Sequence, residues 1–270
     1  MGAETPSILR PPVLWNEAPA PPHAALPGFR TGDEFVELDL PGSGAITVTV
    51  DTIVVHGPDE STRQQVLAQL GSWALGQQLR ALGFTVINGS CITRNGRSII
   101  LTGPPRVGSS LLALVLIERG WSLTSDGIVA WDADEVPLVL SEEVTVDRSV
   151  IIGLDPARII PAMSERDRVR VLCPSIGSGE LAGAVLLGRR AAIGAPQVIY
   201  NENANPLAER LSTTPIPALI RGRANRPHHV PAVPGLRVLR PLNGDEQVLR
   251  SSAPPVLAAL IESQLLELCS

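Results

Sequence analysis

The segment SIILTGPPRVGSSLLALVLIERG, residues 98–120, decides the fold. Its opening residues, SIILT, are rich in β-branched side chains and predict a strand. The apolar run from Leu111 to Ile117 predicts a helix that ends at Arg119-Gly120. Gly103 and Gly108 bound the loop between them. A glycine-bounded loop that leads from a strand into a helix is the setting that a phosphate-binding loop requires, because the N–H groups of the first helical turn face the anion.

The loop follows the pattern G-x-x-x-x-G-K-[ST] at three of its four fixed positions, which are Gly103, Gly108 and Ser110. In that pattern the lysine reaches the outer phosphates and the hydroxyl residue holds Mg²⁺. Ser109 occupies the lysine position, and the chain contains no lysine at all, since its 22 basic residues are all arginine. The scaffold of an anion-binding loop is therefore present without its cation.

Strands and helices are expected on both sides of this segment. Residues 84–92 predict a strand, and Asn95-Gly96 predicts a tight hairpin turn into the strand before the loop. Residues 59–82 predict a helix capped by Asp59 or Ser61, and residues 121–131 predict a strand interrupted by an acidic turn at Asp126. Short β-like runs follow at Val136–Leu140, Val144–Val146, Val150–Leu154, Val169–Leu172, Ala184–Leu187 and Leu236–Leu239.

The chain divides into three parts on composition. Residues 1–33 form a proline-rich N-terminal arm in which we expect no regular structure, and residues 34–82 form a small strand and helix unit. Residues 83–270 form the core with the loop. This core includes a proline-rich excursion over residues 201–234 and ends in an amphipathic helix over residues 257–268.

Composition excludes several classes of protein. With 44% apolar residues and a net charge of −5, the chain is expected to fold, and its acidic balance argues against a nucleic-acid partner. The three cysteines lie far apart and lack the spacing of a metal knuckle. The N-terminus has no signal-peptide pattern, and no apolar run is long enough to cross a membrane. We therefore expect a cytoplasmic protein.

The order of these motifs resembles the HPr kinase/phosphorylase family, and more closely the shorter HPr-kinase-like proteins of peptide natural-product pathways. Asn88-Gly89-Ser90, the loop from Gly103, its helix, and Ser125-Asp126 follow in the family's order. The likeness covers residues 70–135 well and the flanks in outline. It implies an α/β fold with a P-loop core that binds ATP and Mg²⁺ and phosphorylates a serine, with a carboxylate of paired aspartates as the base.

The resemblance assigns roles residue by residue. It places Gly103, Arg106, Gly108, Ser109 and Ser110 in the nucleotide-binding loop, with Ser110 also on the metal. Three further positions concern the chemistry. Asp126 matches the first aspartate and is the candidate catalytic residue, whereas Gly127 replaces the second aspartate and Asn88 stands where the family commonly has histidine.

The leading hypothesis is a degenerate kinase-like protein that binds a precursor peptide or a partner enzyme of such a pathway. A single cationic group in phosphoryl transfer is worth about 10³-fold or more, so losing the lysine and one carboxylate removes most catalysis. The binding of ATP and Mg²⁺ is left open.

Two alternatives stay open. In the first, the chain is an active ATP-dependent serine kinase in which an arginine replaces the lysine. Arg106 is the first candidate, and Arg94 or Arg97 are others, as is the cationic cluster of the excursion, which we also consider for peptide or phosphate binding: Arg221, Arg223 and Arg226. In the second, the chain is an interaction module whose turn only looks like a phosphate loop.

Overall fold

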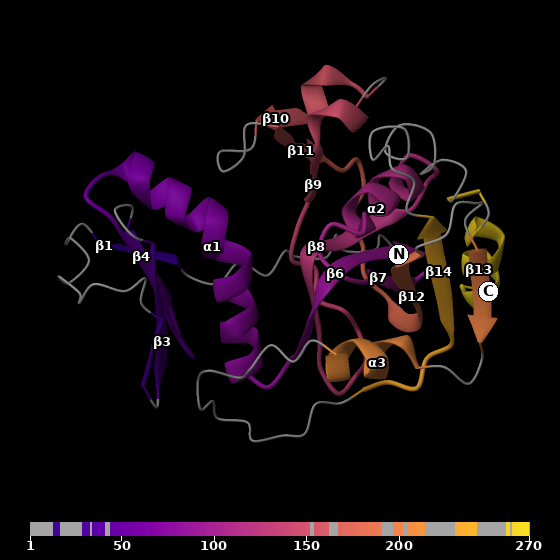
Figure 1. The fold of residues 1–270 in the computed structure, drawn as a ribbon, viewed down its shortest axis with the longest axis horizontal. Helices are drawn as coiled ribbons and strands as arrows, with labels where there is room; N and C mark the ends of the chain where they lie inside the picture. The colour runs from indigo at the N-terminus through magenta and orange to yellow at the C-terminus, as the bar shows by residue number, and fades with distance from the viewer. Residues whose placement is uncertain are drawn as a thin grey trace, which may run out of the picture.

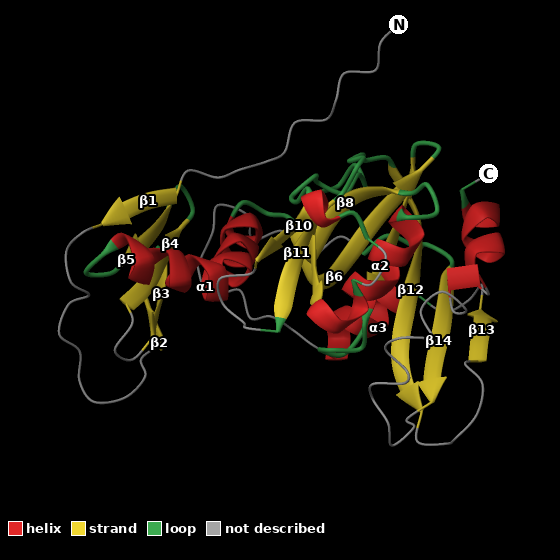
Figure 2. Cartoon of the chain, turned by 90° about the horizontal axis from the view of Figure 1, so that it is seen from above, coloured by secondary structure: helices red, strands yellow, loops and turns green. Residues whose placement is uncertain are grey.

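The computed structural model describes residues 13–16, 29–32, 34–40, 44–151, 154–161, 167–190, 197–201, 205–213, 230–241, 258–259 and 261–269. They form a smaller N-terminal unit and a larger unit that carries the loop, and the two lie side by side (Figures 1 and 2). The predicted α/β class is confirmed, as are the N-terminal strand and helix unit and the helix at the C-terminal end.

The N-terminal unit is a five-stranded sheet covered by one helix. Its strands are β1 (Val13–Asn16), β2 (Phe29–Thr31), β3 (Phe35–Leu40), β4 (Gly44–Thr49) and β5 (Ile53–His56), in the order β1-β5-β4-β3-β2. Alternate residues of β3, β4 and β5 pack against α1 (Glu60–Ala81) around Val36, Ile46 and Val66. This alternation is what a sheet with one buried face requires.

Two of these strands correct the expectation for the arm. Within residues 1–33, β1 pairs in parallel with β5, and β2 pairs antiparallel with β3. Regular structure was not expected because seven prolines break this region. None of them falls inside either strand, and both strands lie at the sheet edges, where the backbone pairs with only one neighbour.

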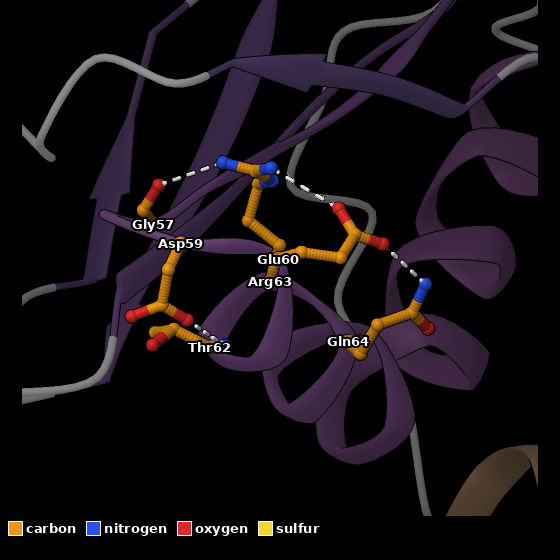
Figure 3. Close-up of polar contacts among 6 residues, drawn as sticks. All are labelled: Gly57, Asp59, Glu60, Thr62, Arg63 and Gln64. Carbon is orange, nitrogen blue, oxygen red and sulfur yellow. Dashed lines mark hydrogen bonds and ion pairs between the residues drawn. The ribbon is translucent and has the colours of Figure 1, made fainter.

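The start of α1 is fixed by a local polar network (Figure 3). The carboxylate of Asp59 accepts the N–H of Thr62 at 2.7 Å, which confirms Asp59 as the helix cap. The buried Arg63 donates to the carbonyl of Gly57 at 3.2 Å and to Glu60 at 3.1 Å, and Gln64 donates to Glu60 at 2.8 Å. These bonds set the direction in which α1 leaves the sheet.

The larger unit is built on a six-stranded mixed sheet with the order β13-β14-β12-β7-β6-β8. Its bounds are β6 (Thr85–Arg94), β7 (Arg97–Thr102), β8 (Ser122–Trp131), β12 (Glu180–Arg190), β13 (Gln197–Asn201) and β14 (Gly235–Pro241). The predicted hairpin is confirmed: β6 and β7 pair antiparallel across Asn95 and Gly96, both with positive φ. Strands β7, β12 and β14 are parallel.

Helices cover both faces of this sheet. Alternate residues of β7 face α2 (Ser109–Ile117) through Ile99 and Leu101, whereas Ile100 faces the opposite side, where Leu207 of α3 (Pro206–Thr213) is buried. The far ends of β6 and β8 contact α1, which joins the two units. An open sheet with helices on both faces leaves the carboxyl ends of its parallel strands exposed. Ligands of open α/β sheets bind at these ends.

A small three-stranded sheet packs on the outer side of α2. It consists of β9 (Glu143–Asp147), β10 (Ile159–Pro161) and β11 (Arg168–Leu172) in the order β10-β11-β9. Val144 and Val146 of β9 face the same core as α2. This sheet brings β9 next to β8, on the side where the loop enters α2.

Several expectations for the later elements were wrong. The run Val136–Leu140 contributes only a bridge between Trp131 and Pro137, and a 3-10 turn (Arg148–Val150) and a bend replace the expected strand over Val150–Leu154 in its described residues. The turn expected within residues 121–131 is instead a continuous strand with an irregularity opposite Cys91 and Ile92. Strands β10 and β13 and helix α3 were not predicted.

The C-terminal helix is described at residues 258–259 and 261–268. Ion pairs connect it to the residues that follow α2 and to the end of β6. Glu262 receives two hydrogen-bonding contacts of 2.6 Å from Arg119, and Arg94 lies 3.5 Å from its other oxygen. Arg94 also stacks over the ring of the buried Trp121, 5.7 Å from its centroid. None of the helices in the described part of the chain combines the length and the apolar character needed to cross a membrane.

Candidate functional site

The loop leaves β7 at its carboxyl end and turns sharply into α2. A hydrogen bond of 3.2 Å from Val107 N–H to the carbonyl of Pro104 closes the turn. Arg106 has φ 63° and Gly108 has φ 97°, both in the left-handed region. Gly108 is the N-cap of α2 and offers no side chain, so the first N–H groups of the helix have no side-chain cap from it. The N–H groups at the start of α2 are the donors that this turn offers to an anion, because Pro104 and Pro105 have no N–H and that of Val107 bonds within the turn.

The conformation of the loop explains why glycine occupies positions 103 and 108. A Cβ on Gly103 would lie 2.3 Å from the carbonyl oxygen of Leu187 on the neighbouring strand β12 and 2.9 Å from Val107. Gly103 is therefore required by the close approach of β7 and β12. Gly108 is required by its positive φ, which costs a residue with a side chain about 1–2 kcal/mol. The glycine frame is needed to build the turn whether or not a phosphate binds there.

Asp126 on β8 is the carboxylate of the site. Its Oδ1 accepts the hydroxyl of Ser90 on β6 at 2.6 Å, and its Oδ2 accepts the backbone N–H of Thr145 on β9 at 3.0 Å. The hydroxyl of Ser110, in the first turn of α2, lies close enough to this carboxyl to lower its pKa. Asp126 thus connects β6, β9 and α2 at the point where the loop ends.

Burial and hydrogen bonding shift the pKa of Asp126 in opposite directions. Burial raises the pKa of this carboxyl above its ordinary value, and burial is the largest influence. The hydrogen bonds from Ser90, Thr145 and Ser110 lower the pKa, because they favour the charged form, but they do not outweigh burial. A carboxyl group whose pKa is raised in this way is suited to hold a proton or a cation.

The three departures from the family pattern lie together at this site. Gly89 is opposite Thr102 on one side, just before the loop, and opposite Gly127 on the other. Asn88 therefore adjoins the loop and is exposed. Gly127 is also exposed, has φ 85°, and a Cβ there would lie 3.5 Å from the hydroxyl of Ser72 on α1. Ser109 begins α2 directly after Gly108.

The structure thus gathers Gly103, Arg106, Gly108, Ser109 and Ser110 in one turn, and it brings Asp126 to Ser110. Arg106 is exposed in the middle of the loop. The peptide- or phosphate-binding candidates Arg221, Arg223 and Arg226 lie outside the described residues.

Two of the substitutes considered for the lysine are excluded by their position. Arg97 begins β7, and the loop follows its last residue, so the length of the strand, about 16 Å, separates them. Arg94 ends β6 at the same hairpin, where Trp121 and Glu262 hold its guanidinium. The hairpin turn therefore directs both arginines away from the loop.

Sequence reasoning missed two partners of Asp126. Ser90 belongs to the Asn-Gly-Ser stretch of the strand before the hairpin. Its hydroxyl, on a strand next to that of Asp126, could have indicated a hydrogen bond to this carboxylate. Thr145 contributes its backbone N–H, and nothing in a side-chain pattern indicates which backbone group will face a carboxylate 19 residues earlier in the chain.

The residues fit the phosphate end of Mg-ATP only in part. The backbone of the turn and the first turn of α2 fit a phosphate group, and Ser110 with Asp126 supplies the oxygen ligands that Mg²⁺ prefers. The lysine position holds the neutral Ser109, so the loop offers no positive charge at that position. In the described residues, no group of three or more His, Cys, Asp and Glu side chains is placed to hold a metal ion.

Comparisons with known proteins give a distant likeness to solved structures. No protein-family model matches the chain, and no curated protein matches it. Among solved structures, the Hpr(Ser) kinase/phosphatase from Coxiella burnetii covers 69% of this chain and 99% of its own, with 11% identity and a TM-score of 0.35.

Proposed function

We propose that this chain is a degenerate P-loop kinase-like protein that acts by binding and not by transferring phosphate. The observation that carries the proposal is that Ser109 and Gly127, where the resemblance expects a lysine and an aspartate, both lie at the site beside Asp126. Catalysis of phosphoryl transfer depends on positioning and on neutralising charge at the phosphates. The site keeps the positioning backbone and lacks two of the charged groups.

The remaining carboxylate supports the same interpretation. Asp126 accepts hydrogen bonds from Ser90 of β6 and Thr145 of β9, and the Ser110 hydroxyl of α2 lies close enough to lower its pKa. A group with these partners stabilises the junction between the sheet, α2 and β9. Its retention is thus explained by structure, without a role as catalytic base.

The ligand in this proposal is a peptide or a partner protein. The resemblance of residues 70–135 suggests a precursor peptide or an enzyme of a peptide natural-product pathway. A turn of this form receives an acidic or phosphorylated side chain through backbone N–H groups, and an isolated contact of this kind is weak. Specificity would then come from the surfaces around the loop.

The competing function is an active serine kinase in which Arg106 replaces the lysine. One observation favours it: Arg106 lies inside the loop and is exposed. Arginine binds phosphate groups through a planar fork of donors, so its chemistry suits the role.

Isothermal titration with Mg-ATP tests the proposal, using the wild-type chain and Ser109→Lys. We expect the wild type to bind with Kd weaker than about 1 mM. A restored charge-assisted contact contributes about 1.5–3 kcal/mol, so Ser109→Lys should bind roughly ten- to hundredfold more tightly. Micromolar binding by the wild type, together with phosphorylation of a serine peptide, would overturn the proposal. A Ser109→Lys variant that binds no better would show that the turn does not receive phosphate.

A further inference from the structure

Thr145 presents both of its backbone groups to the outer edge of β9. In an antiparallel pair, opposed residues alternate between those that exchange both hydrogen bonds and those whose groups point away from the partner. Cys173 N–H bonds the carbonyl of Glu142, and Arg148 N–H bonds the carbonyl of Asp167, so bonded pairs stand at both ends of the β9–β11 ladder. Alternating inward from either end makes Thr145 a residue whose N–H and C=O point away from β11.

These two groups bind side chains of opposite charge. The N–H of Thr145 donates to Oδ2 of Asp126 at 3.0 Å, and its carbonyl accepts from Nη2 of Arg168 at 2.8 Å. The N and O atoms of one extended residue lie less than about 4 Å apart, so the guanidinium and the carboxylate are within about 10 Å of each other. Arg168 is the cation that reaches Asp126 through a single residue.

The neighbouring arginine of β11, Arg170, binds a side chain of β9 and not its backbone. Arg170 lies two residues from Arg168 on the same face of the strand, and it forms an ion pair of 2.9 Å with Glu143. Its guanidinium is thereby directed to the side chain of Glu143, whereas Arg168 binds the backbone of Thr145. The two arginines form a natural test pair, since they share strand, face and charge.

We propose that Arg168 is a positioning residue of the candidate site, which holds the Thr145 backbone so that its N–H stays aimed at Asp126. The inference rests on the proposed function only in taking Asp126 as the carboxylate of the site. A hydrogen bond of this kind depends on direction, because it weakens steeply when the N–H turns away from the acceptor. Fixing the carbonyl of the same residue fixes that direction.

Other groups around Asp126 do not replace this contact. Ser90 of β6 and Ser110 of α2 are neutral side-chain groups, and the backbone N–H of Gly127 belongs to the residue next to Asp126, so none of them holds the Thr145 backbone. Cys173, after β11, is a titratable neighbour that interacts with Asp126, but burial raises the pKa of its thiol to about 12, so it stays neutral. Arg168 differs from these groups because it acts on Asp126 through the backbone of Thr145.

Hydrogen exchange of backbone amides, followed by NMR on the full chain without ligand, tests the inference. In Arg168→Ala we expect the Thr145 amide to exchange about tenfold faster, whereas the amides of Val144 and Val146, which bond to β11, change less than about twofold. Arg170→Ala should leave Thr145 unchanged. Arg168→Met keeps the aliphatic stem without its donors, and it provides the same measurement if the alanine variant does not fold.

The pH profile of the Asp126 carboxyl gives a second measurement that a purely structural role would not change. Loss of the Thr145 hydrogen bond, which favours the charged form of the carboxyl, should raise its midpoint in Arg168→Ala but not in Arg170→Ala. Unchanged exchange at Thr145, or an equal rise at Val144, Thr145 and Val146, would overturn the inference. Neither measurement involves nucleotide, so a negative result for Arg168 would not affect the proposed function. Detection of phosphoryl transfer by the chain would likewise not affect the inference about Arg168.

Discussion

The hydroxyl of Ser90 donates a hydrogen bond of 2.6 Å to Oδ1 of Asp126, directly across the β6–β8 pair. Ser90 is fully buried, and the bond lies where the loop enters α2. The candidate site is therefore part of the packing of the sheet. Changes to its polar residues should alter stability as well as binding.

Ser90→Ala should lower the free energy of unfolding by about 1–3 kcal/mol, because the buried carboxyl of Asp126 loses a hydrogen-bond partner. Denaturant unfolding measures this. Ser125→Ala is the matched control: Ser125 is equally buried on β8, and its hydroxyl has no hydrogen-bond partner, so its removal should cost little. Equal losses in both variants would contradict the role given to Ser90.

The stability of the chain should depend on the ionisation of Asp126. Because the folded state raises the pKa of this carboxyl above its ordinary value of 3.8, the folded state binds the proton more tightly than the unfolded state. The stabilising contribution is complete below pH 3.8 and is lost as pH rises through the folded pKa.

Asp126→Asn removes this dependence. We therefore expect the stability difference between the wild type and the variant to change in favour of the variant as pH rises above about 4. Unfolding curves recorded from pH 3.5 to 7.5 measure the difference. A wild type that gains stability relative to Asp126→Asn over this range would refute the direction of the shift.

Gly103→Ala should destabilise the chain more than Gly120→Ala. A Cβ at Gly103 meets the Leu187 carbonyl at 2.3 Å, so β7 and β12 must separate, whereas a Cβ at Gly120 meets nothing within 4 Å. Gly120 has φ 93°, so its replacement reports backbone strain alone, about 1–2 kcal/mol. Chemical denaturation of both variants gives the comparison. A smaller loss at Gly103 would show that the strands tolerate the extra atom.

The strand–loop–helix segment and the preceding hairpin were predictable because their signals are local. Asn95-Gly96 specifies a tight turn, and the apolar run after Ser110 specifies a buried helix. The strand β1 was not predictable, since it depends on pairing with β5, about 40 residues later, and not on its own proline-rich surroundings. Long-range pairing likewise determines β13.

The site was predictable in part for the same reason. The loop residues and Asp126 follow from motif spacing, whereas the contacts of Asp126 with Ser90 and Thr145 depend on strand register. Nothing in the spacing of residues along one strand conveys that information.

Glu262→Gln should loosen the C-terminal helix. Glu262 is the common partner of Arg119 and Arg94, and its side chain is largely buried. Arg119 is more exposed, so solvent screens its share, and we expect a loss of about 1 kcal/mol that shrinks in high salt. Thermal unfolding at low and high ionic strength measures the loss of stability and its dependence on salt. A loss that is independent of salt would contradict an electrostatic contact.

The formation of ADP from Mg-ATP by the wild-type chain, assayed beside Arg106→Ala, decides between a binding protein and an active kinase. We predict that ADP appears no faster with either protein than in buffer, because the charged groups that phosphoryl transfer needs are missing at Ser109 and Gly127. Turnover by the wild type that is lost in a correctly folded Arg106→Ala variant would contradict the proposed function and would identify an active kinase with arginine in the lysine's role.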